Sequence, residues 1–458
     1  MELLSPAGNF EKLKYAFLYG ADAAYLGLPG FSLRAAADNF FQDEASKIRE
    51  LRKQFPEKKI YCALNISFHQ GDLKNLADRV EEIRSFDFDA FIVQDLGAVD
   101  FLQKNFPRAK LHLSTQANCI NAEAAKMYRK LGFSRIVLGR EASLAEIAEI
   151  KNSAPEIQLE TFIHGAMCIA YAGRCLLSAY STGRSANSGE CAHSCRWEYR
   201  LLEERKRPGQ FLPILETDRW TEILSSKDLC MIDHLAEFKK AGVDSLKIEG
   251  RMKSLYYTAL VTRAYRKAID LNEGLIDENT ARPFINELKT TAHREWTTGF
   301  YFNKAEADKT TDGATFTDFD LIGTLGEKLS SHEVLEIAQN SQKKFDETMA
   351  ALHPIKREHL LKKPENNRKF LQEKPGFNLF PFNTMNKVDA TEPLEFVSPE
   401  ICKLESKNHI FVDPNTGEIQ NFTAHGIETL IYSDLPLGEN FIVRKRIQES
   451  QTPTDRHR

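Results

Sequence analysis

Short apolar runs alternate with helical patterns over about the first 255 residues of the chain. The runs lie in MELLSPAG, ADAAYLGL, KIYCALNISF, AFIVQDL, KLHLSTQANC, RIVLGRE, IQLETFIHGAMC and VDSLKIEG. Strand signals that alternate with helix signals at this spacing predict parallel βα units. About eight strands can be counted, which favours an α/β fold of the (β/α)8 TIM-like barrel type over an open doubly wound sheet. No GxGxxG motif follows the first strand, which weakens the dinucleotide-binding alternative.

Polar residues recur at the points where these apolar runs end. They are Asn65, Gln94, Asp95, Ser114, Thr115, Gln116, Arg140, Glu141, His164, Glu249 and Arg251. In a barrel the C-terminal ends of the strands meet at one mouth, where active sites lie. We therefore expect a site at this mouth, although loops are polar without any function as well.

The pattern changes after Asp318, where short strand signals are separated by Gly, Pro, Asn and Asp. This change predicts a small β domain. We expect a TIM-like barrel over residues 1–310 and a C-terminal β domain over residues 311–458. Residues 256–300 look helical and are expected to close the barrel against its first helices. Residues 340–374 are highly charged. This composition is typical of a helical insertion, of a basic arm or of a solvated surface segment.

Composition narrows the classes of function. The 458 residues are 42% hydrophobic and 28% charged, with a formal net charge of -4. Nothing in this balance requires a nucleic-acid or membrane partner. No segment approaches the ~20 apolar residues of a membrane span, and no basic flank precedes an apolar run at the N-terminus. We expect a cytoplasmic protein, in whose reducing compartment structural disulfides are rare.

Four of the eight cysteines lie in one short span of small and polar residues: Cys168, Cys175, Cys191 and Cys195. Cys230 follows in SSKDLCMIDHL. No CxxC pair occurs, so the spacing does not specify zinc, while thiolates also hold iron–sulfur clusters at irregular spacing. A cysteine peptidase would need an imidazole beside one thiol, and His164 and His193 are available. One nucleophile would leave three clustered cysteines unexplained, which favours metal or cluster binding.

A family resemblance enters with these motifs. ETFIHGAMCIAYAGRCLLS, GRSANSGECAHSCRWEYRL, SSKDLCMIDHL and AGVDSLKIEGRMKS closely resemble the collagenase-like peptidase family, the unclassified peptidase family thirty-two. The similarity begins at ELLSPAGNFEKLKYAF and extends to about residue 300, with a weaker match beyond. The family name implies proteolysis. Several members are instead understood as iron–sulfur proteins for oxygen-independent hydroxylation of a tRNA wobble uridine, an rRNA cytidine or a ubiquinone precursor.

The motif GECAHSCRWEY and the separate β domain resemble the tRNA-hydroxylation branch, whereas ubiquinone-pathway members are shorter. The resemblance implies formation of 5-hydroxyuridine at the wobble position, with prephenate as the hydroxyl donor. It implies a 4Fe-4S cluster held by Cys168, Cys175 and Cys191. For the fourth ligand we choose Cys195, which lies in the same motif, with Cys230 as the alternative.

The cluster is expected at the barrel mouth, on the loop after the sixth strand. His164, Glu249, Arg251 and Arg140 would hold the anionic donor and the target base there. The planar fork of arginine pairs with a carboxylate through two hydrogen bonds, which suits a dicarboxylate such as prephenate. Glu249 could move a proton, or it could form a salt bridge with Arg251.

The expected partners are tRNA and a small anionic donor, without a membrane, and the chain could form a homo- or hetero-oligomer with a related family member. Trp197 and Tyr199 offer a stacking surface for RNA bases. Three alternatives remain: a cysteine-type or metal-dependent collagenase-like peptidase, an rRNA cytidine hydroxylation enzyme, and a non-catalytic RNA-binding iron–sulfur scaffold.

Overall fold

The computed structural model describes residues 1–34, 37–196, 215–216, 221–222, 226–303, 315–351 and 378–447. Its contacts divide the chain into two compact units, Met1–Thr317 and Asp318–Arg458. The boundary between the two units thus lies after Thr317, whereas the sequence pattern predicts a boundary after residue 310. Trp197 and Tyr199 lie outside the described residues, as does the charged segment beyond residue 351.

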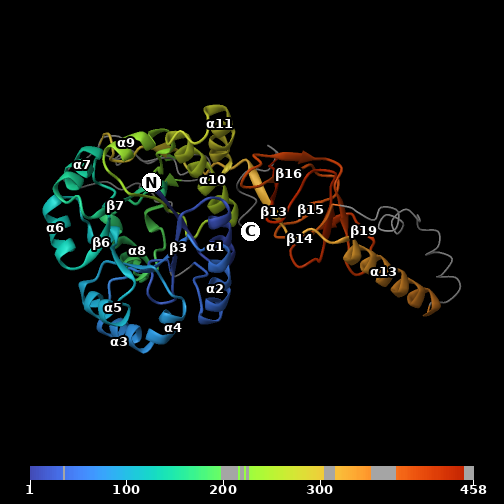
Figure 1. Ribbon diagram of the computed structural model, residues 1–458, viewed down its shortest axis with the longest axis horizontal. Helices are drawn as coiled ribbons and strands as arrows, with labels where there is room; N and C mark the ends of the chain where they lie inside the picture. The colour runs from blue at the N-terminus through green and yellow to red at the C-terminus, as the bar shows by residue number, and fades with distance from the viewer. Residues whose placement is uncertain are drawn as a thin grey trace. The chain divides into compact units, whose positions relative to one another are not determined.

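The first unit is a closed barrel of parallel strands ringed by helices, which confirms the predicted (β/α)8 fold (Figure 1). The strands are β1 (Glu2–Pro6), β2 (Ala23–Gly27), β3 (Lys59–Leu64), β4 (Ala90–Val93), β5 (Lys110–Leu113), β6 (Phe133–Val137), β7 (Gln158–Ala166) and β11 (Ser245–Ile248). Strand β11 pairs in parallel with both β7 and β1, and this double pairing closes the barrel.

Helices follow the barrel strands in alternation. They are α1 (Phe10–Leu18), α2 (Ala45–Gln54), α3 (Gln70–Asp78), α4 (Val80–Ser85), α5 (Val99–Asn105), α6 (Ala122–Lys130), α7 (Leu144–Ser153), α9 (Leu235–Lys240), α10 (Leu255–Asn272) and α11 (Glu278–Asn286). Side-chain caps fix several starts: Asn9 accepts from the Lys12 amide, and Ser254 accepts from that of Tyr257. Helix α10 packs on α1 and β1, so the predicted helical segment does close the barrel against its first helix.

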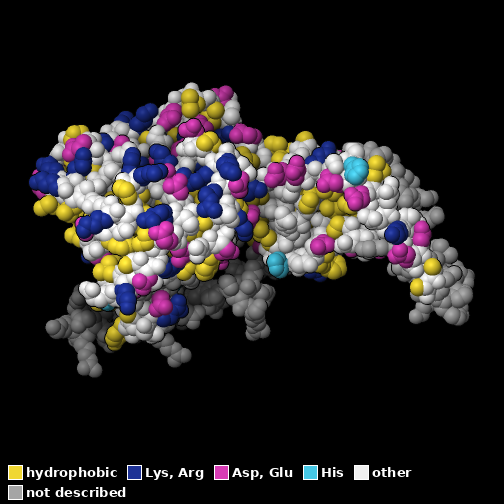
Figure 2. Space-filling view, turned by 60° about the horizontal axis from the view of Figure 1, so that its bottom comes forward, with side chains coloured by type: hydrophobic (Ala, Val, Ile, Leu, Met, Phe, Trp, Pro, Cys, Tyr) yellow, Lys and Arg dark blue, Asp and Glu magenta, His cyan; other side chains and the backbone are white. Residues whose placement is uncertain are grey.

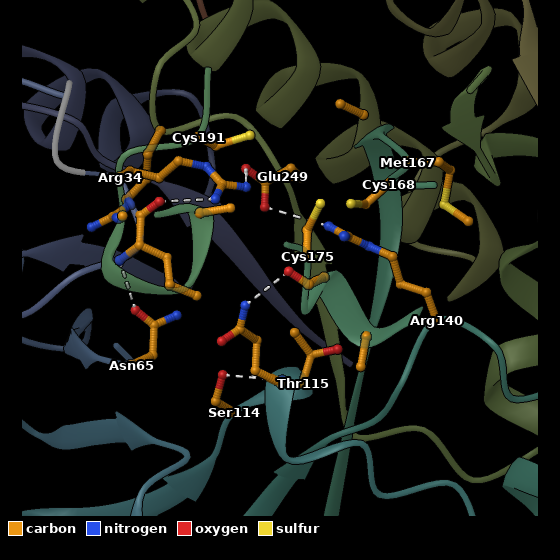
Figure 3. Close-up of a pocket in the computed structure, with 18 of the residues that line it drawn as sticks. Arg34, Asn65, Ser114, Thr115, Arg140, Met167, Cys168, Cys175, Cys191 and Glu249 are labelled. Atoms are coloured by element: carbon orange, nitrogen blue, oxygen red, sulfur yellow. Dashed lines mark hydrogen bonds and ion pairs between the residues drawn. The ribbon is translucent and has the colours of Figure 1, made fainter. Parts of the chain in front are cut away.

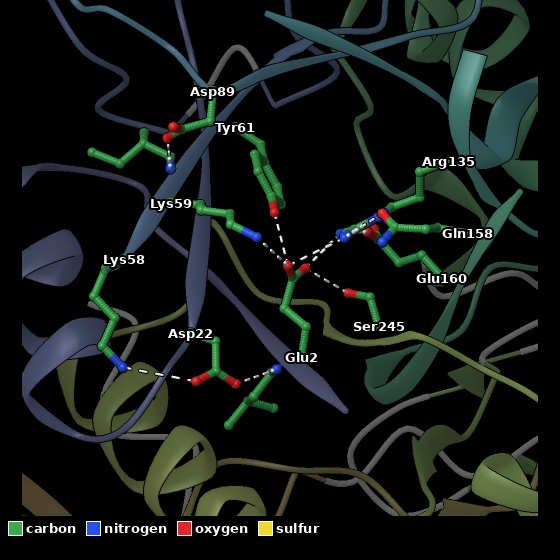
Figure 4. Close-up of polar contacts among 12 residues, drawn as sticks. Glu2, Asp22, Lys58, Lys59, Tyr61, Asp89, Arg135, Gln158, Glu160 and Ser245 are labelled. Carbon is green, nitrogen blue, oxygen red and sulfur yellow. Dashed lines mark hydrogen bonds and ion pairs between the residues drawn. The ribbon is translucent and has the colours of Figure 1, made fainter. Parts of the chain in front are cut away.

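Paired charges fill the interior of the barrel toward the N-terminal ends of its strands (Figure 4). Glu160 is fully buried and accepts from Arg135 Nη1 at 3.1 Å and from Lys247 Nζ at 2.8 Å. Arg135 also pairs with Glu2, which accepts from Tyr61 Oη at 2.9 Å. Because each buried charge has an opposite partner, the network avoids the large cost of an isolated ion. Its far end, Lys247, reaches the cavity at the mouth.

The second unit is built on an antiparallel sheet with the strand order β17-β16-β22-β13-β14-β21-β18-β19. The strands are β13 (Phe319–Leu325), β14 (Leu379–Thr384), β16 (Leu394–Val397), β17 (Leu404–Ser406), β18 (Ile410–Val412), β19 (Ile419–Gln420), β21 (Leu430–Tyr432) and β22 (Ile442–Arg446), with β15 (Val388–Asp389) paired to β20 (Phe422–Thr423). This architecture confirms the predicted β domain. Helix α13 (Ser331–Ala351) extends into the charged segment, and its residues Val334 and Ala338 pack against the sheet.

Charges of both signs are interspersed over the barrel unit on the face drawn in Figure 2, in line with the small net charge of -4. Within the described part of the chain, no helix combines the length and the apolar character that crossing a membrane requires.

Candidate active site

The C-terminal mouth of the barrel holds a cavity of about 170 Å³, here called the cysteine cavity (Figure 3). The strand-end loops contribute Leu33, Arg34, Asn65, Ser114, Thr115, Gln116, Arg140, Glu249, Arg251 and Met252 to its wall. The segment after β7 folds over these loops and contributes Met167, Cys168, Cys175, Cys191, His193 and Cys195. This segment follows the seventh barrel strand rather than the sixth, since β1 to β7 all precede it.

Four of the predicted cysteine ligands are brought together around this cavity: Cys168, Cys175, Cys191 and Cys195. Cys168 is exposed, the other three are partly buried, and all four are free thiols. Burial raises the pKa of Cys195 and Arg196 lowers it, while the neighbouring thiols of Cys168, Cys191 and Cys175 raise it further. All four thus line one cavity, although they are up to 27 positions apart in the sequence, from 168 to 195.

The loop that carries Cys175 is held by its own hydrogen bonds. The Cys175 amide donates to Asn187 Oδ1 at 3.2 Å, and Asn187 Nδ2 donates back to the Cys175 carbonyl at 3.1 Å. The Leu177 amide donates to Cys175 Sγ at 3.3 Å. A backbone N–H aimed at sulfur stabilises a thiolate or a metal-bound sulfur. The same hydrogen bond would also be available to a metal-bound sulfur of Cys175.

Cys230, the alternative fourth ligand, does not line the cysteine cavity. It ends β10 (Asp228–Cys230), where it pairs with His164 of β7, and its Sγ lies 3.9 Å from Tyr265 Oη of α10. Burial raises the pKa of the Cys230 thiol to about 11. The structure therefore groups Cys195, and not Cys230, with the other three cysteines of the motif.

His164, expected in the mouth, is buried outside the cavity wall. A β-bulge skips one residue of β7, so that Lys247 pairs with Phe162 but Ile248 pairs with His164. This shift changes the face on which the following side chain lies. The imidazole consequently packs on α10, with Nδ1 3.3 Å from Tyr265 Oη, and burial lowers its pKa to about 3. The expectation that His164 holds the donor or base is corrected on this geometry.

Glu249 and the arginines occupy the centre of the cavity wall (Figure 3). Glu249 accepts from Arg34 Nη2 at 3.1 Å and from Arg140 Nη2 at 3.4 Å. Burial alone would raise the pKa of Glu249, but Arg34, Arg140 and Arg251 outweigh it and lower the pKa to about 2. Glu249 is consequently a counter-ion at neutral pH, and a poor proton acceptor. It pairs with Arg34 and Arg140 rather than with Arg251, which donates to Ser32 Oγ.

Two buried polar atoms in this wall lack a hydrogen-bond partner among the described residues: Arg251 Nη1 and Gln116 Oε1. Buried polar atoms are nearly always paired, so unpaired ones at a cavity point to a ligand that pairs with them. The two atoms are a donor and an acceptor, which is the pair that a planar amide or a nucleobase edge can satisfy.

Arg34 and Lys247 also line the cavity, and the sequence analysis missed both. Arg34 lies in FSLRAAA, after a strand end that carries no recognisable motif. Lys247 lies inside the apolar run VDSLKIEG. A lone lysine in a predicted barrel strand is the one sequence signal that could have indicated a charge inside the barrel. A charge in a strand that is buried on both faces must have a partner in the barrel, and Glu160 is that partner.

Within the described residues, no three His, Cys, Asp or Glu side chains are close enough to bind one metal ion together. In a polynuclear cluster each cysteine binds a different iron, so the sulfur atoms stand farther apart than around a single ion.

Replacing Glu249 with glutamine tests the electrostatics of the wall. Because its folded-state pKa is depressed to about 2, Glu249 stabilises the fold fully above the ordinary value of 4.5 and progressively less below it. We expect Glu249→Gln to be less stable than the wild type at neutral pH, with a difference that shrinks as the pH falls from 4.5 toward 2.

Urea unfolding of both proteins at several pH values measures this difference. Glu149→Gln, at an exposed position of α7, is the matched control and should follow the wild type throughout. A difference between Glu249→Gln and the wild type that stays constant with pH would contradict the assigned role of the three arginines.

Comparison with known proteins supplies independent information. The sequence pattern of Peptidase family U32 matches residues 8–311. The chain is 38% identical over 341 residues to "tRNA hydroxylation protein P" of Escherichia coli, covering 65% of this chain and 74% of that protein. It is 35% identical to the "23S rRNA 5-hydroxycytidine C2501 synthase" of Escherichia coli, covering 67% and 46%. It is 31% identical to a "Collagenase" of Porphyromonas gingivalis, covering 66% and 74%.

Proposed function

This chain belongs to peptidase family U32, and from that premise we propose that it hydroxylates RNA. The observation that carries the proposal is the cysteine cavity, in which four free thiols and four arginines share one wall at the catalytic end of a barrel. Relatives named for tRNA hydroxylation and for rRNA 5-hydroxycytidine synthesis support the same reaction class. The finer proposal is 5-hydroxyuridine at the tRNA wobble position, with prephenate as the hydroxyl donor.

The thiols Cys168, Cys175, Cys191 and Cys195 would hold a 4Fe-4S cluster. Four thiolates make such a site anionic overall, and the wall provides a matching excess of positive charge, because Arg34, Arg140 and Arg251 face the single carboxylate Glu249. The amide of Leu177 already donates to one of the sulfurs. When bound, the cluster supplies redox or Lewis-acid chemistry next to the arginines.

The arginines would bind and orient the donor. Arg140 and Arg251 flank Glu249, and Arg251 keeps one buried nitrogen without a partner among the described residues. A dicarboxylate would offer carboxylate oxygen atoms to both guanidinium groups. The new hydroxyl replaces a hydrogen of the base, which oxidises the base, so an oxygen-independent reaction needs a donor that gives up oxygen and accepts the electron pair.

The target base would enter the same cavity, with Gln116 Oε1 as a buried acceptor for a base N–H. A cavity of about 170 Å³ beneath a loop is not accessible to a stacked base, so the nucleotide has to leave the stack. Exposed Tyr171 and Tyr180, on the segment that bears the cysteines, offer rings on which neighbouring bases can stack.

A thiol peptidase has less support in this geometry. Its nucleophile needs an imidazole hydrogen bond. Among the described residues, none of the four cavity thiols is hydrogen-bonded to a histidine, and His164 packs away from the cavity. The neighbouring His193 has its pKa lowered to about 4 by burial and by four arginines, so it would be uncharged and could not stabilise a thiolate as an ion pair.

Nucleoside mass spectrometry of a strain that lacks this chain tests the proposal. We expect 5-hydroxyuridine derivatives to disappear from its tRNA and to return when the wild-type chain is supplied. The rRNA of the same strain is analysed in parallel, because loss of hydroxycytidine there would assign the activity to rRNA. Unchanged nucleosides in both RNA pools would overturn the proposed function.

A further inference from the structure

A second cavity of about 310 Å³ adjoins the cysteine cavity. The two share the lining residues Arg34, Ala166, His193, Arg196, Glu249 and Met252. The second cavity alone is lined by Asp228, Gly250, Lys253, His293, Arg294 and Thr315. Its wall therefore comes mainly from the segments that follow β7 and β11, the seventh and eighth strands of the barrel.

The charges of this wall do not balance. Arg294 and Asp228 form a close pair, with Nε to Oδ1 at 3.2 Å and the Arg294 amide to Oδ2 at 3.0 Å. Glu249 is shared by Arg34 and Arg140. Both carboxylates of the second cavity are thus already engaged.

Arg196 and Lys253 have no carboxylate partner among the described residues. The hydrogen bonds recorded for their side chains go to the carbonyls of Met167 and Ala292, each at 3.4 Å. Burial lowers the pKa of Lys253, and Arg294 lowers it further. Two cations that lack a carboxylate partner among the described residues are stabilised when an anion enters the cavity that they line.

We propose that the second cavity binds a phosphate group of the nucleotide whose base occupies the cysteine cavity. This inference rests on the proposed function, since it assigns the base to the adjoining cavity. In TIM-like barrels the loops after the seventh and eighth strands frequently form a phosphate site. Lys253 stands two positions before Leu255, where the 18-residue helix α10 begins, so the positive end of the helix dipole adds to the two cations.

The shared residues explain how one nucleotide could span both cavities. Arg196 and Met252 contribute to both walls, so the sugar would pass between them while the base and phosphate lie on either side. The phosphate contact would hold the RNA in one register, so that one nucleotide is presented to the cysteine cavity. Such a contact fixes position but does not distinguish one base from another.

Isothermal titration calorimetry of the full chain with uridine 5′-monophosphate and with uridine tests the site. We expect the monophosphate to bind more tightly than the nucleoside, and Lys253→Gln and Arg196→Gln each to weaken its binding roughly tenfold or more. Lys253→Gln, which changes a residue that lines the second cavity alone, should not change the binding of uridine. Lys240→Gln, an exposed lysine at the end of α9, is the matched control and should bind both probes as the wild type does.

Unchanged monophosphate affinity in both variants would overturn the phosphate site, as would equal affinity of the wild type for uridine and its monophosphate. A dicarboxylate probe, malonate, separates the other anion class: if its binding depends on Lys253 while that of the monophosphate does not, the cavity holds a carboxylate donor and the inference is wrong. Lys253-dependent monophosphate binding in a protein whose deletion leaves tRNA and rRNA unchanged would uphold the site and overturn only the hydroxylation.

Discussion

Cys195→Ser is expected to lose the iron of the anaerobically purified protein and to abolish RNA hydroxylation, while Cys230→Ser keeps both. Cys195 shares the cavity with the other three thiols, whereas Cys230 lies on β10 against Tyr265. A cubane cluster needs a thiolate on each iron, and a serine hydroxyl is a much weaker ligand. The measurement is iron and acid-labile sulfide per chain, with about four irons expected for the wild type.

Cys230→Ser is the matched control, because it makes the same chemical change at a cysteine that is also partly buried. Thermal unfolding of both apo proteins separates ligand loss from a folding defect. Full iron content in Cys195→Ser together with an iron-free Cys230→Ser would reverse the assignment of the fourth ligand. Full iron content in both variants and in Cys175→Ser would contradict a four-cysteine site altogether.

Glu160→Gln is expected to destabilise the fold by about 3–5 kcal/mol. Glu160 is fully buried and accepts from Arg135 (Figure 4) and from Lys247. A neutral side chain at this position leaves the Lys247 ammonium without its counter-ion inside the barrel. The free energy of unfolding in urea measures the loss. The exposed pair of Glu123 and Lys126 provides the control, and Glu123→Gln should unfold as the wild type does.

The second substitution Lys247→Met distinguishes an unpaired charge from lost packing. In the Glu160→Gln background it removes the orphaned ammonium, so we expect it to restore part of the lost stability. A Glu160→Gln protein as stable as the wild type would show that the interior network contributes nothing to the fold. A double variant that is less stable than Glu160→Gln would assign the loss to packing around Lys247.

Much of the fold follows from periodicity in the sequence. Buried parallel strands read as continuous apolar runs, so the runs from MELLSPAG to VDSLKIEG mark the barrel. In the second unit the strand β14 (Leu379–Thr384) has a weak signal in the sequence, because Pro381 interrupts its pattern and the charged segment precedes it. Proline lacks an amide donor and argues against a strand, yet here it occupies a position within the ladder.

The site was less predictable than the fold. The four clustered cysteines, Arg140 and Glu249 were found at the mouth because strand ends converge there. His164 was misplaced because one bulged residue changes the face of the strand, which an alternation pattern cannot reveal. Arg34 and Asn187 act through contacts made across the fold, and neither lies in a motif whose spacing announces its role.

Reconstitution with purified components tests the central claim most directly. The chain is loaded with iron and sulfide in the absence of oxygen and is then mixed with prephenate and with tRNA from the deletion strain. The masses of the tRNA nucleosides are measured by mass spectrometry. We predict a uridine heavier by one oxygen atom, formed by the wild type and by Cys230→Ser but absent with Cys195→Ser. Iron-loaded wild type that leaves every nucleoside unchanged while it hydrolyses gelatin would contradict RNA hydroxylation and support the peptidase alternative.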